Sequence, residues 1–247
     1  MQPDEYTRMH DLEDHYWWFV GRRTLALGLL YSKLDQDQTW RILDLGCGTG
    51  VISQEMAKEH EVIGLDMSPL ALKFCKGRGL EKLVRADGTR LPVKTEVADA
   101  MVGLDIFEHI EDDCAAFREA YRSLRPGGRL VMSVPAFRLL WGPHDIALMH
   151  FRRYTRPEVR RKLVDAGFEI ERISYSVFLL FPVVIIVRLF EKLKRGEPKA
   201  SLAVLPNWLN QLLINVQAFE ANLISKLDLP WGSSVIAVAR KPHGAVR

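Results

Sequence analysis

Cysteine is scarce in this chain of 247 residues, and long apolar runs are missing. The three cysteines, Cys47, Cys75 and Cys114, show no metal-ligand spacing, and their odd number argues against a disulfide framework. The first five residues lack the basic and apolar regions of a signal peptide, so we expect a cytoplasmic protein. The most apolar stretch, residues 177–187, is shorter than the roughly twenty residues that cross a bilayer.

A strong excess of charge of one sign is also missing. The formal net charge is +3, which is too small to indicate a nucleic-acid-binding protein. What is present is the composition of a globular protein, with 48% hydrophobic and 26% charged residues. The length suits one large domain, or a domain with an insertion.

Strand-like and helix-like segments alternate from residue 41 onward. Strand patterns occupy 41–45, 61–65, 83–84, 100–104 and 129–134, the last after a Pro-Gly-Gly turn at 126–128. Helical patterns lie at 51–58, from Pro69 onward and at 112–124. This alternation predicts an α/β fold, with a parallel sheet and helices on both faces.

The C-terminal part adds a helix, two strands and an insertion. Thr155 and Pro157 begin a helix that runs to Ala166, where Gly167 suits its end, and strands are expected at 168–174 and 233–239. The connection between these strands is too long for an ordinary loop and contains a helical pattern at about 206–227. We therefore divide a single domain, 1–247, into a helical N-terminal lid (1–38), a core (39–175 with 230–241) and an apolar helical insertion (176–229).

A glycine-rich turn joins the first strand to the helix that follows it. Three glycines at alternate positions between residues 46 and 50 let the backbone approach a ligand where a Cβ would clash. Asp66, Asp87 and Asp105 follow later strands, and ligands of doubly wound sheets bind at these carboxyl ends. An acidic rim without a lysine in the turn suits a cation or a hydroxyl-rich ligand better than a triphosphate. The glycine spacing also misses the dinucleotide-binding fingerprint by one residue.

These motifs resemble those of class I S-adenosylmethionine-dependent methyltransferases, in particular the type 11-like group. The resemblance is carried by Asp-Leu-Gly-Cys-Gly-Thr-Gly at 44–50, Asp66, Ala-Asp-Gly at 86–88, Leu-Asp-Ile-Phe-Glu-His-Ile at 104–110 and Leu-Arg-Pro-Gly-Gly at 124–128. It implies a Rossmann-like, doubly wound seven-stranded sheet in the order 3-2-1-4-5-7-6, with the last strand antiparallel, and S-adenosyl-L-methionine as the cofactor. The residues that it places at the cofactor are Asp44, Gly46, Cys47, Gly48, Gly50, Asp66, Met67, Asp87, Gly88, Leu104 and Asp105.

Histidines provide the first candidates for catalysis. An oxygen or nitrogen acceptor has to lose a proton, and a histidine of near-neutral pKa suits that task. His109 is the first candidate base, although Glu108 and His109 could instead only shape the start of the following helix. His144 and Tyr154 are further catalytic candidates. The spacing of His144 and His150 does not indicate a metal, so none is expected.

The polar segment after the fifth strand is expected to face the acceptor. With Trp-Trp-Phe at 17–19 and Arg22-Arg23, it resembles a bacterial methyltransferase subgroup associated with envelope and glycan biosynthesis. The predicted acceptor-binding residues are Trp18, Trp141, His144, His150, Arg152 and Arg153. The alternative is that the two arginines pair with surface acids while the aromatic residues pack. We also expect Arg22 or Arg23 to reach the carboxylate of the cofactor.

The insertion is more apolar than a small lid requires. Basic residues follow its apolar run at Arg188, Lys192, Lys194 and Arg195, where an interfacial helix would meet anionic headgroups. We therefore expect methylation of an apolar, isoprenoid or lipid-linked small molecule, with peripheral contact through 177–195 at the inner face of the membrane. The alternatives are packing of this run in the core, a water-soluble sugar or nucleotide-sugar acceptor, and a non-catalytic protein that binds the cofactor or a lipid. No nucleic-acid partner is expected.

Overall fold

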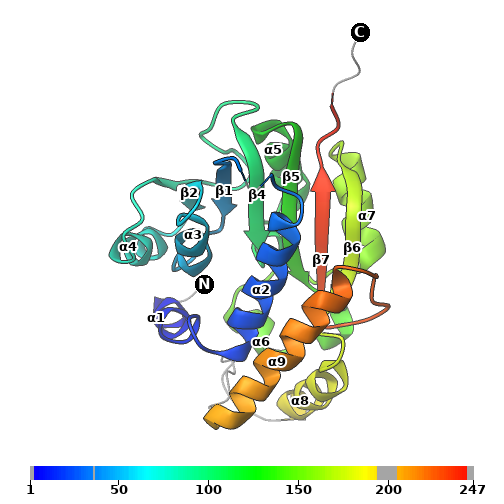
Figure 1. The fold of residues 1–247 in the computed structure, drawn as a ribbon. Coiled ribbons are helices and arrows are strands. Elements are labelled where there is room, and N and C mark those ends of the chain that lie inside the picture. The colour runs from blue at the N-terminus through cyan, green and yellow to red at the C-terminus, as the bar shows by residue number, and fades with distance from the viewer. Residues whose placement is uncertain (1–2, 36, 194–204, 244–247) are drawn as a thin grey trace.

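The computed structural model describes residues 3–35, 37–193 and 205–243, and it centres on a seven-stranded sheet (Figure 1). The strand order is β3-β2-β1-β4-β5-β7-β6. The strands are β1 (Arg41–Leu45), β2 (Glu61–Asp66), β3 (Leu83–Arg85), β4 (Ala98–Leu104), β5 (Leu124–Pro135), β6 (Glu169–Ser176) and β7 (Ser234–Arg240). Neighbouring strands from β3 to β5 pair in parallel, whereas β7 pairs antiparallel with both β5 and β6. The predicted order and the antiparallel last strand are confirmed.

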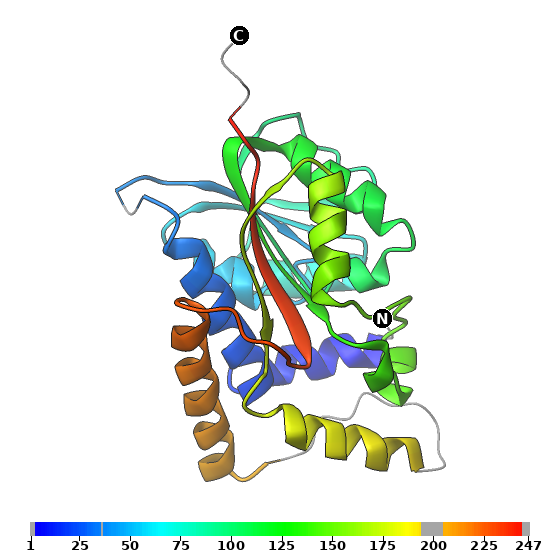
Figure 2. The same ribbon diagram turned by 90° about the vertical axis from the view of Figure 1, so that its right-hand side faces the viewer.

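Helices cover both faces of the sheet (Figures 1 and 2). On one face, α5 (Asp113–Ser123) and α7 (Arg156–Asp165) enclose a core that includes Phe107, Phe117 and Tyr154. On the other face, α2 (Trp17–Tyr31), α3 (Val51–Met56) and α9 (Asn207–Ile224) enclose a core that includes Leu30 and Ile42. The central strands are therefore buried on both sides, as their near-continuous apolar sequences predict.

Strand β5 begins earlier than predicted. Leu124 already pairs with Ala98, and regular pairing resumes only at Ala100 and Arg129. The Pro-Gly-Gly segment lies in this irregular part of the strand, where Gly127 has a φ of +84°. The turn signal in the sequence therefore marks a bulge near the start of β5 rather than the connection that precedes it.

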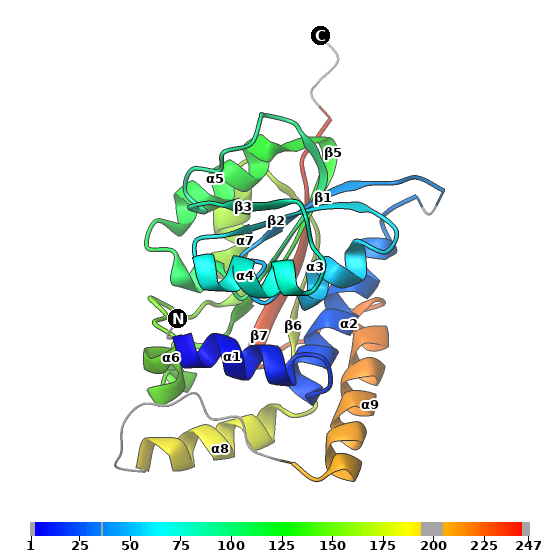
Figure 3. The ribbon, with the colours of Figure 1, turned by 90° about the vertical axis from the view of Figure 1, so that its left-hand side faces the viewer.

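The remaining helices lie across the end of the sheet where the parallel strands finish (Figure 3). They are α1 (Pro3–Leu12), α6 (Pro143–Ala147) and α8 (Phe181–Leu193), while α4 (Pro69–Gly77) packs beside β2 and β3. The insertion consists of α8 and α9, the latter close to the predicted 206–227. Asn210 of α9 accepts a hydrogen bond from the Trp17 N–H (2.9 Å) and donates one to the His15 carbonyl (2.8 Å). Segments almost two hundred residues apart thus meet beside the sheet end.

No helix in the described ranges combines the length and the apolar character needed to span a membrane. Of the predicted basic residues that follow the apolar run, Lys194 and Arg195 lie outside the described residues, and so does the side chain of Lys192.

Candidate active site

The glycine-rich turn lies directly after β1, at the carboxyl end of the sheet. Gly46 and Gly48 have φ angles of +71° and +55°, which residues with a side chain rarely adopt. A Cβ on Gly46 would lie 2.6 Å from the Ile106 side chain. The backbone of this turn therefore leaves a concave wall that a larger residue would fill.

Two carboxylates border this wall. Asp66 ends β2 and accepts hydrogen bonds from the backbone N–H groups of Gly48 (2.9 Å) and Ser68 (2.8 Å). Burial raises the pKa of Asp66, and these two hydrogen bonds oppose the rise. Asp87 follows β3, is exposed and accepts hydrogen bonds from the Thr89 N–H and hydroxyl, both at 2.9 Å. Both acids retain oxygen lone pairs for the hydroxyl or amino groups of a ligand.

A single cavity of about 1330 Å³ connects the turn to the helices of the insertion. Ten of the eleven residues predicted at the cofactor line it: Asp44, Gly46, Cys47, Gly48, Asp66, Met67, Asp87, Gly88, Leu104 and Asp105. Gly50 is not among the lining residues and instead provides the left-handed N-cap of α3, packed towards Cys75. The glycine cradle and the two acids fit the nucleoside part of S-adenosylmethionine.

Asp105 and Arg22 form an ion pair in the wall of the cavity. Asp105 lies just beyond β4 with a φ of +53°, and it also accepts a hydrogen bond from the Ser133 hydroxyl at 2.8 Å. Burial raises the pKa of Asp105, but the Arg22 guanidinium and the Ser133 hydroxyl outweigh this, so the pKa lies below its usual value. Arg23, the neighbour of Arg22, lies outside the lining and donates to the Glu13 carbonyl at 3.1 Å.

Helix α1 closes the cofactor end of the cavity with side chains that no sequence motif marks. Tyr6, Met9 and Glu13 line the cavity, together with the predicted aromatic residues at 16–19. The Glu13 carboxylate accepts hydrogen bonds from the Thr49 hydroxyl and from Arg78, and so ties α1 to the glycine turn. No local motif marks these residues, because their role depends on contacts with a distant part of the chain.

The two histidines predicted to be catalytic both line the cavity. His109 ends the short 3-10 helix η1 (Phe107–His109), and His144 lies in α6. Burial lowers the pKa of each to about 3. Both rings are therefore neutral at pH 7, but His109 lacks the near-neutral pKa expected of an efficient general base. The low pKa argues against proton removal by His109, whose role in catalysis stays a prediction.

The structure does not support Tyr154, the third residue predicted to be catalytic, in that role. Its side chain belongs to the core beneath the sheet and does not line the cavity. The hydroxyl donates to Asp113 at 2.7 Å, and the Phe107 carbonyl lies 3.2 Å away. Burial raises the pKa of the hydroxyl, and the hydrogen bond to Asp113 adds to the rise. Tyr154 therefore joins α5 to η1, and its hydroxyl does not reach the cavity.

The residues predicted to bind the acceptor divide into two groups. Trp18, His144, His150 and Arg153 line the cavity, whereas Trp141 and Arg152 do not. Arg152 pairs with Asp113 at 3.0 Å and donates to the Glu111 carbonyl at 2.6 Å. Arg152 thus pairs with a nearby acid, which is the alternative to acceptor binding.

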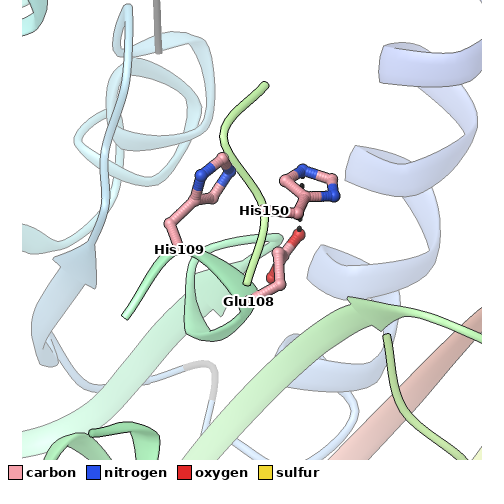
Figure 4. A group of neighbouring side chains, drawn as sticks. All are labelled: Glu108, His109 and His150. Carbon is pink, nitrogen blue, oxygen red and sulfur yellow. Dashed lines mark ion pairs between the residues drawn. The ribbon is translucent and has the colours of Figure 1, made fainter. Parts of the chain in front are cut away.

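Asp145 organises the polar side of the acceptor end. Its carboxylate accepts hydrogen bonds from Arg153 at 2.7 and 3.0 Å, from His150 at 2.9 Å and from the Gly142 N–H at 2.9 Å. Burial raises the pKa of Asp145, but the hydrogen bonds from His150 and Arg153 outweigh it and hold the pKa well below its usual range. Beside it, Glu108 and His109 lie close to His150 (Figure 4).

The opposite side of the acceptor end is apolar. Helices α8 and α9, with the segment that precedes α9, contribute Leu180, Val183, Val184, Val187, Leu205, Leu209 and Leu213 to the lining. Arg188 is the one basic side chain that the described part of α8 places there. The apolar insertion predicted from the sequence thus forms a wall of the same cavity that holds the glycine turn.

This strand order, with a glycine cradle after β1 and acids after β2 and β3, defines the class I S-adenosylmethionine-dependent methyltransferase fold. Comparison with known proteins agrees. Residues 43–132 match the family model described as a methyltransferase domain. A S-adenosylmethionine-dependent methyltransferase structure from Thermotoga maritima covers 96% of this chain and 95% of its own, with a TM-score of 0.61 and 16% identity. A chain from a complex of the Haloferax volcanii Trm112 methyltransferase activator with a methyltransferase has a TM-score of 0.64 and 17% identity, covering 99% and 97%.

A curated relative gives a more specific likeness. The ubiquinone biosynthesis O-methyltransferase of Xanthomonas oryzae is 31% identical over 158 residues, which are 56% of this chain and 66% of the relative. The chain thus spans slightly less than two thirds of the length of the curated relatives that it matches. Residues 43–132 thus match a methyltransferase domain, within a fold that the chain shares with S-adenosylmethionine-dependent methyltransferases.

Proposed function

We propose that the protein transfers a methyl group from S-adenosylmethionine to a hydroxyl oxygen of an apolar small molecule, of the isoprenoid or lipid-linked class. The observation that carries this proposal is the continuity of the cavity, which runs from the glycine turn to the apolar side chains of α8 and α9. The 31% identical relative from Xanthomonas oryzae, named as an O-methyltransferase of ubiquinone biosynthesis, supports oxygen as the acceptor atom.

The chain's main task in this reaction is placement. When bound, S-adenosylmethionine supplies a methyl group on a positively charged sulfur, which is already a good leaving group. By the resemblance to the family, Asp66 would bind the ribose hydroxyls and Asp87 the adenine amino group. Asp105, fixed by Arg22 and Ser133, would line the wall near the sulfur. Holding the acceptor oxygen in line with the methyl group then removes much of the barrier.

His144 is suited to orient the acceptor hydroxyl. Its ring is neutral because burial lowers its pKa to about 3, and its Nδ1 atom is buried without a hydrogen-bond partner among the described residues. A neutral imidazole nitrogen accepts a hydrogen bond from a hydroxyl. We therefore assign His144 to positioning rather than to proton removal, for which its pKa is too low.

The apolar acceptor is favoured over a sugar by where the polar residues lie. Arg152 is turned towards Asp113, and Arg153 is fully engaged with Asp145, so neither guanidinium is free to meet a phosphate. Apart from Arg188, the side chains that the insertion contributes to the wall are aliphatic. A sugar or nucleotide sugar would leave these apolar side chains unburied, whereas an isoprenoid chain would bury them.

The cofactor half of the proposal is tested by calorimetry with S-adenosylhomocysteine and with NAD. We expect the protein to bind S-adenosylhomocysteine and not NAD, and Asp66→Ala to weaken that binding about tenfold or more, through the lost hydroxyl contacts. Asp37→Ala, at an exposed acid far from the cavity, serves as the control. Binding of NAD alone would overturn the assignment.

The acceptor half is tested with catechols that carry zero, one, two or three isoprene units. We expect KM to fall with each added unit, because each buries further apolar area against α8 and α9. Leu209→Ala, in the apolar wall, is expected to weaken this dependence. A KM that is independent of chain length, or turnover of nucleotide sugars alone, would contradict an apolar acceptor.

A further inference from the structure

Three side chains with metal-binding atoms meet at the acceptor end of the cavity. Glu108 and His109 come from η1, and His150 comes from the segment that follows α6 (Figure 4). One ligand atom from each lies within 4.8 Å of the others, and all three residues line the cavity. The rings of His109 and His150 meet edge to face, with centroids 4.6 Å apart.

Within this group, the burial of the Glu108 carboxyl group needs an explanation. Its side chain is fully buried, and neither carboxylate oxygen accepts a hydrogen bond from another described residue. The His150 Nε2 atom is 4.0 Å from the nearer oxygen, which is too far for a hydrogen bond. A buried carboxylate without a partner costs several kcal/mol, so such a group indicates that something absent from the protein chain completes it.

The surrounding charges do not compensate Glu108. Arg22 is paired with Asp105, and Arg153 is paired with Asp145 at 2.7 Å. Asp105, Arg22 and Arg153 are the charged side chains that act most strongly on Glu108, and each of them is already part of one of these two ion pairs. The carboxyl group of Glu108 therefore faces the cavity with no guanidinium or ammonium partner of its own among the described residues.

His150 is held as metal-binding histidines are held. Its Nδ1 atom lies 2.9 Å from Asp145, a carboxylate that can only accept, so Nδ1 carries a proton and Nε2 is the ring nitrogen on the side of Glu108. A carboxylate that orients the imidazole in this way is characteristic of metal sites. Arg153 and the Gly142 N–H fix that carboxylate in turn.

We propose that Glu108, His109 and His150 bind a divalent transition-metal cation, of the Mn²⁺ or Zn²⁺ kind, at the acceptor end of the cavity. Two imidazoles and one carboxylate are a donor set for such ions, and this set leaves coordination positions open towards the cavity. Metal–ligand bonds of about 2.0–2.2 Å at tetrahedral or octahedral angles place ligand atoms roughly 2.8–3.6 Å apart, so the group has to contract by up to about 2 Å. No metal is expected from the spacing of His144 and His150, because the other two ligands, Glu108 and His109, lie some 40 residues from His150 in the chain and meet it only in the fold.

The role of this ion rests on the proposed methyl transfer to a hydroxyl group. Two adjacent oxygens of an acceptor, as in a catechol, can occupy the open positions. A bound cation lowers the pKa of a coordinated hydroxyl, whose proton then passes to water, and the oxygen is left as an anionic nucleophile.

The binding itself is tested without turnover. The chelator-treated protein is titrated with Mn²⁺, and the free ion is followed by its electron paramagnetic resonance signal. We expect one Mn²⁺ per chain, with affinity reduced about tenfold or more in Glu108→Gln and in His150→Asn. His144→Asn, in the same cavity but outside the three-residue group, is expected to bind Mn²⁺ as the wild type does.

Calorimetry with S-adenosylhomocysteine on each variant separates folding defects from loss of the metal. Variants that bind S-adenosylhomocysteine but not Mn²⁺ support the site, and Glu108→Asp is expected to recover part of the affinity. A wild type that binds S-adenosylhomocysteine but takes up no Mn²⁺ or Zn²⁺ would overturn the metal site and leave the methyltransferase proposal intact. Equal Mn²⁺ binding by wild type and Glu108→Gln would also overturn it. Failure to bind S-adenosylhomocysteine, with Mn²⁺ still bound, would instead count against the proposed function.

Discussion

Single carboxylates around the cavity differ in what compensates their charge. Asp66 accepts two backbone N–H groups, and Asp105 pairs with Arg22. Asp44, at the end of β1, has the Ser53 hydroxyl at 2.6 Å, and burial raises its pKa to about 6. The same side-chain type therefore has three different environments within one site, and each makes a separate prediction possible.

Asp44→Asn is expected to change how stability depends on pH. The native pKa of Asp44 is about 6 and the unfolded value is 3.8, so between these values the native state binds a proton that the unfolded chain has lost. The contribution of Asp44 to the free energy of unfolding therefore falls as pH rises through this window, by up to about 3 kcal/mol. The variant lacks this fall and should gain stability relative to the wild type as pH rises from 4 to 7.

Urea unfolding of the wild type and the variant at several pH values measures this difference. Asp37→Asn, at an exposed acid, is the control and should show no such trend. A difference between wild type and Asp44→Asn that stays constant from pH 4 to pH 7 would contradict the buried environment described for Asp44.

Arg22→Ala is expected to lower both stability and cofactor affinity. Removing the guanidinium leaves Asp105 unpaired in a largely buried position, at a cost of about 1–3 kcal/mol. Arg22 also lines the cavity, so binding of S-adenosylhomocysteine should weaken. Arg23→Ala is the matched control, since Arg23 lies outside the lining.

The double variant Arg22→Ala with Asp105→Asn separates the two effects. It removes the unpaired charge and should recover much of the stability without restoring affinity for S-adenosylhomocysteine. If neither arginine variant changes that affinity, the expectation that one of them reaches the cofactor fails.

At the scale of elements, the sequence predicts what depends on neighbouring residues. The 44–50 turn, the strands on either side of it and the helix that begins after Thr155 follow from local patterns, and the structure confirms them. Tyr154, Arg152 and Glu108 were assigned or passed over by type alone. Tyr154 and Arg152 meet Asp113 on α5, some 40 residues earlier in the chain, and Glu108 meets His150, some 40 residues later, so only the assembled fold determines their surroundings.

Helix α8 supports a prediction about membranes. Ile186 and Leu189 are more than half exposed and lie outside the lining of the cavity, on a helix that begins within an apolar run. If α8 lies in a membrane interface, as the acceptor class favours, Ile186→Glu with Leu189→Glu should reduce co-sedimentation with anionic vesicles.

Val164→Glu is the matched control for this pair. Val164 is equally exposed but lies on α7, which packs on the sheet away from the insertion. Equal vesicle binding by all three proteins, or no binding by the wild type, would rule out membrane contact through α8.

At the scale of the whole molecule, three separate parts of the chain enclose one cavity. The N-terminal helices close the cofactor end, the carboxyl edge of the sheet supplies the polar groups, and the insertion supplies the apolar wall (Figures 1 and 3). A cofactor with a charged sulfur and an acceptor with an apolar chain need opposite surroundings. The cavity provides polar surroundings at the sheet edge and apolar surroundings at the insertion, and the two regions adjoin each other.

The central claim is that this cavity brings S-adenosylmethionine and an apolar hydroxyl together, and labelled methyl transfer tests it most directly. The protein is incubated with S-adenosylmethionine that carries a labelled methyl group and with a prenylated catechol, and the label is followed into the solvent-extracted product. We predict one labelled methyl group on oxygen for each S-adenosylhomocysteine formed, and little transfer by Asp66→Ala. A protein that binds S-adenosylhomocysteine yet transfers no label to any hydroxyl of an apolar acceptor, with or without added Mn²⁺, would contradict the account.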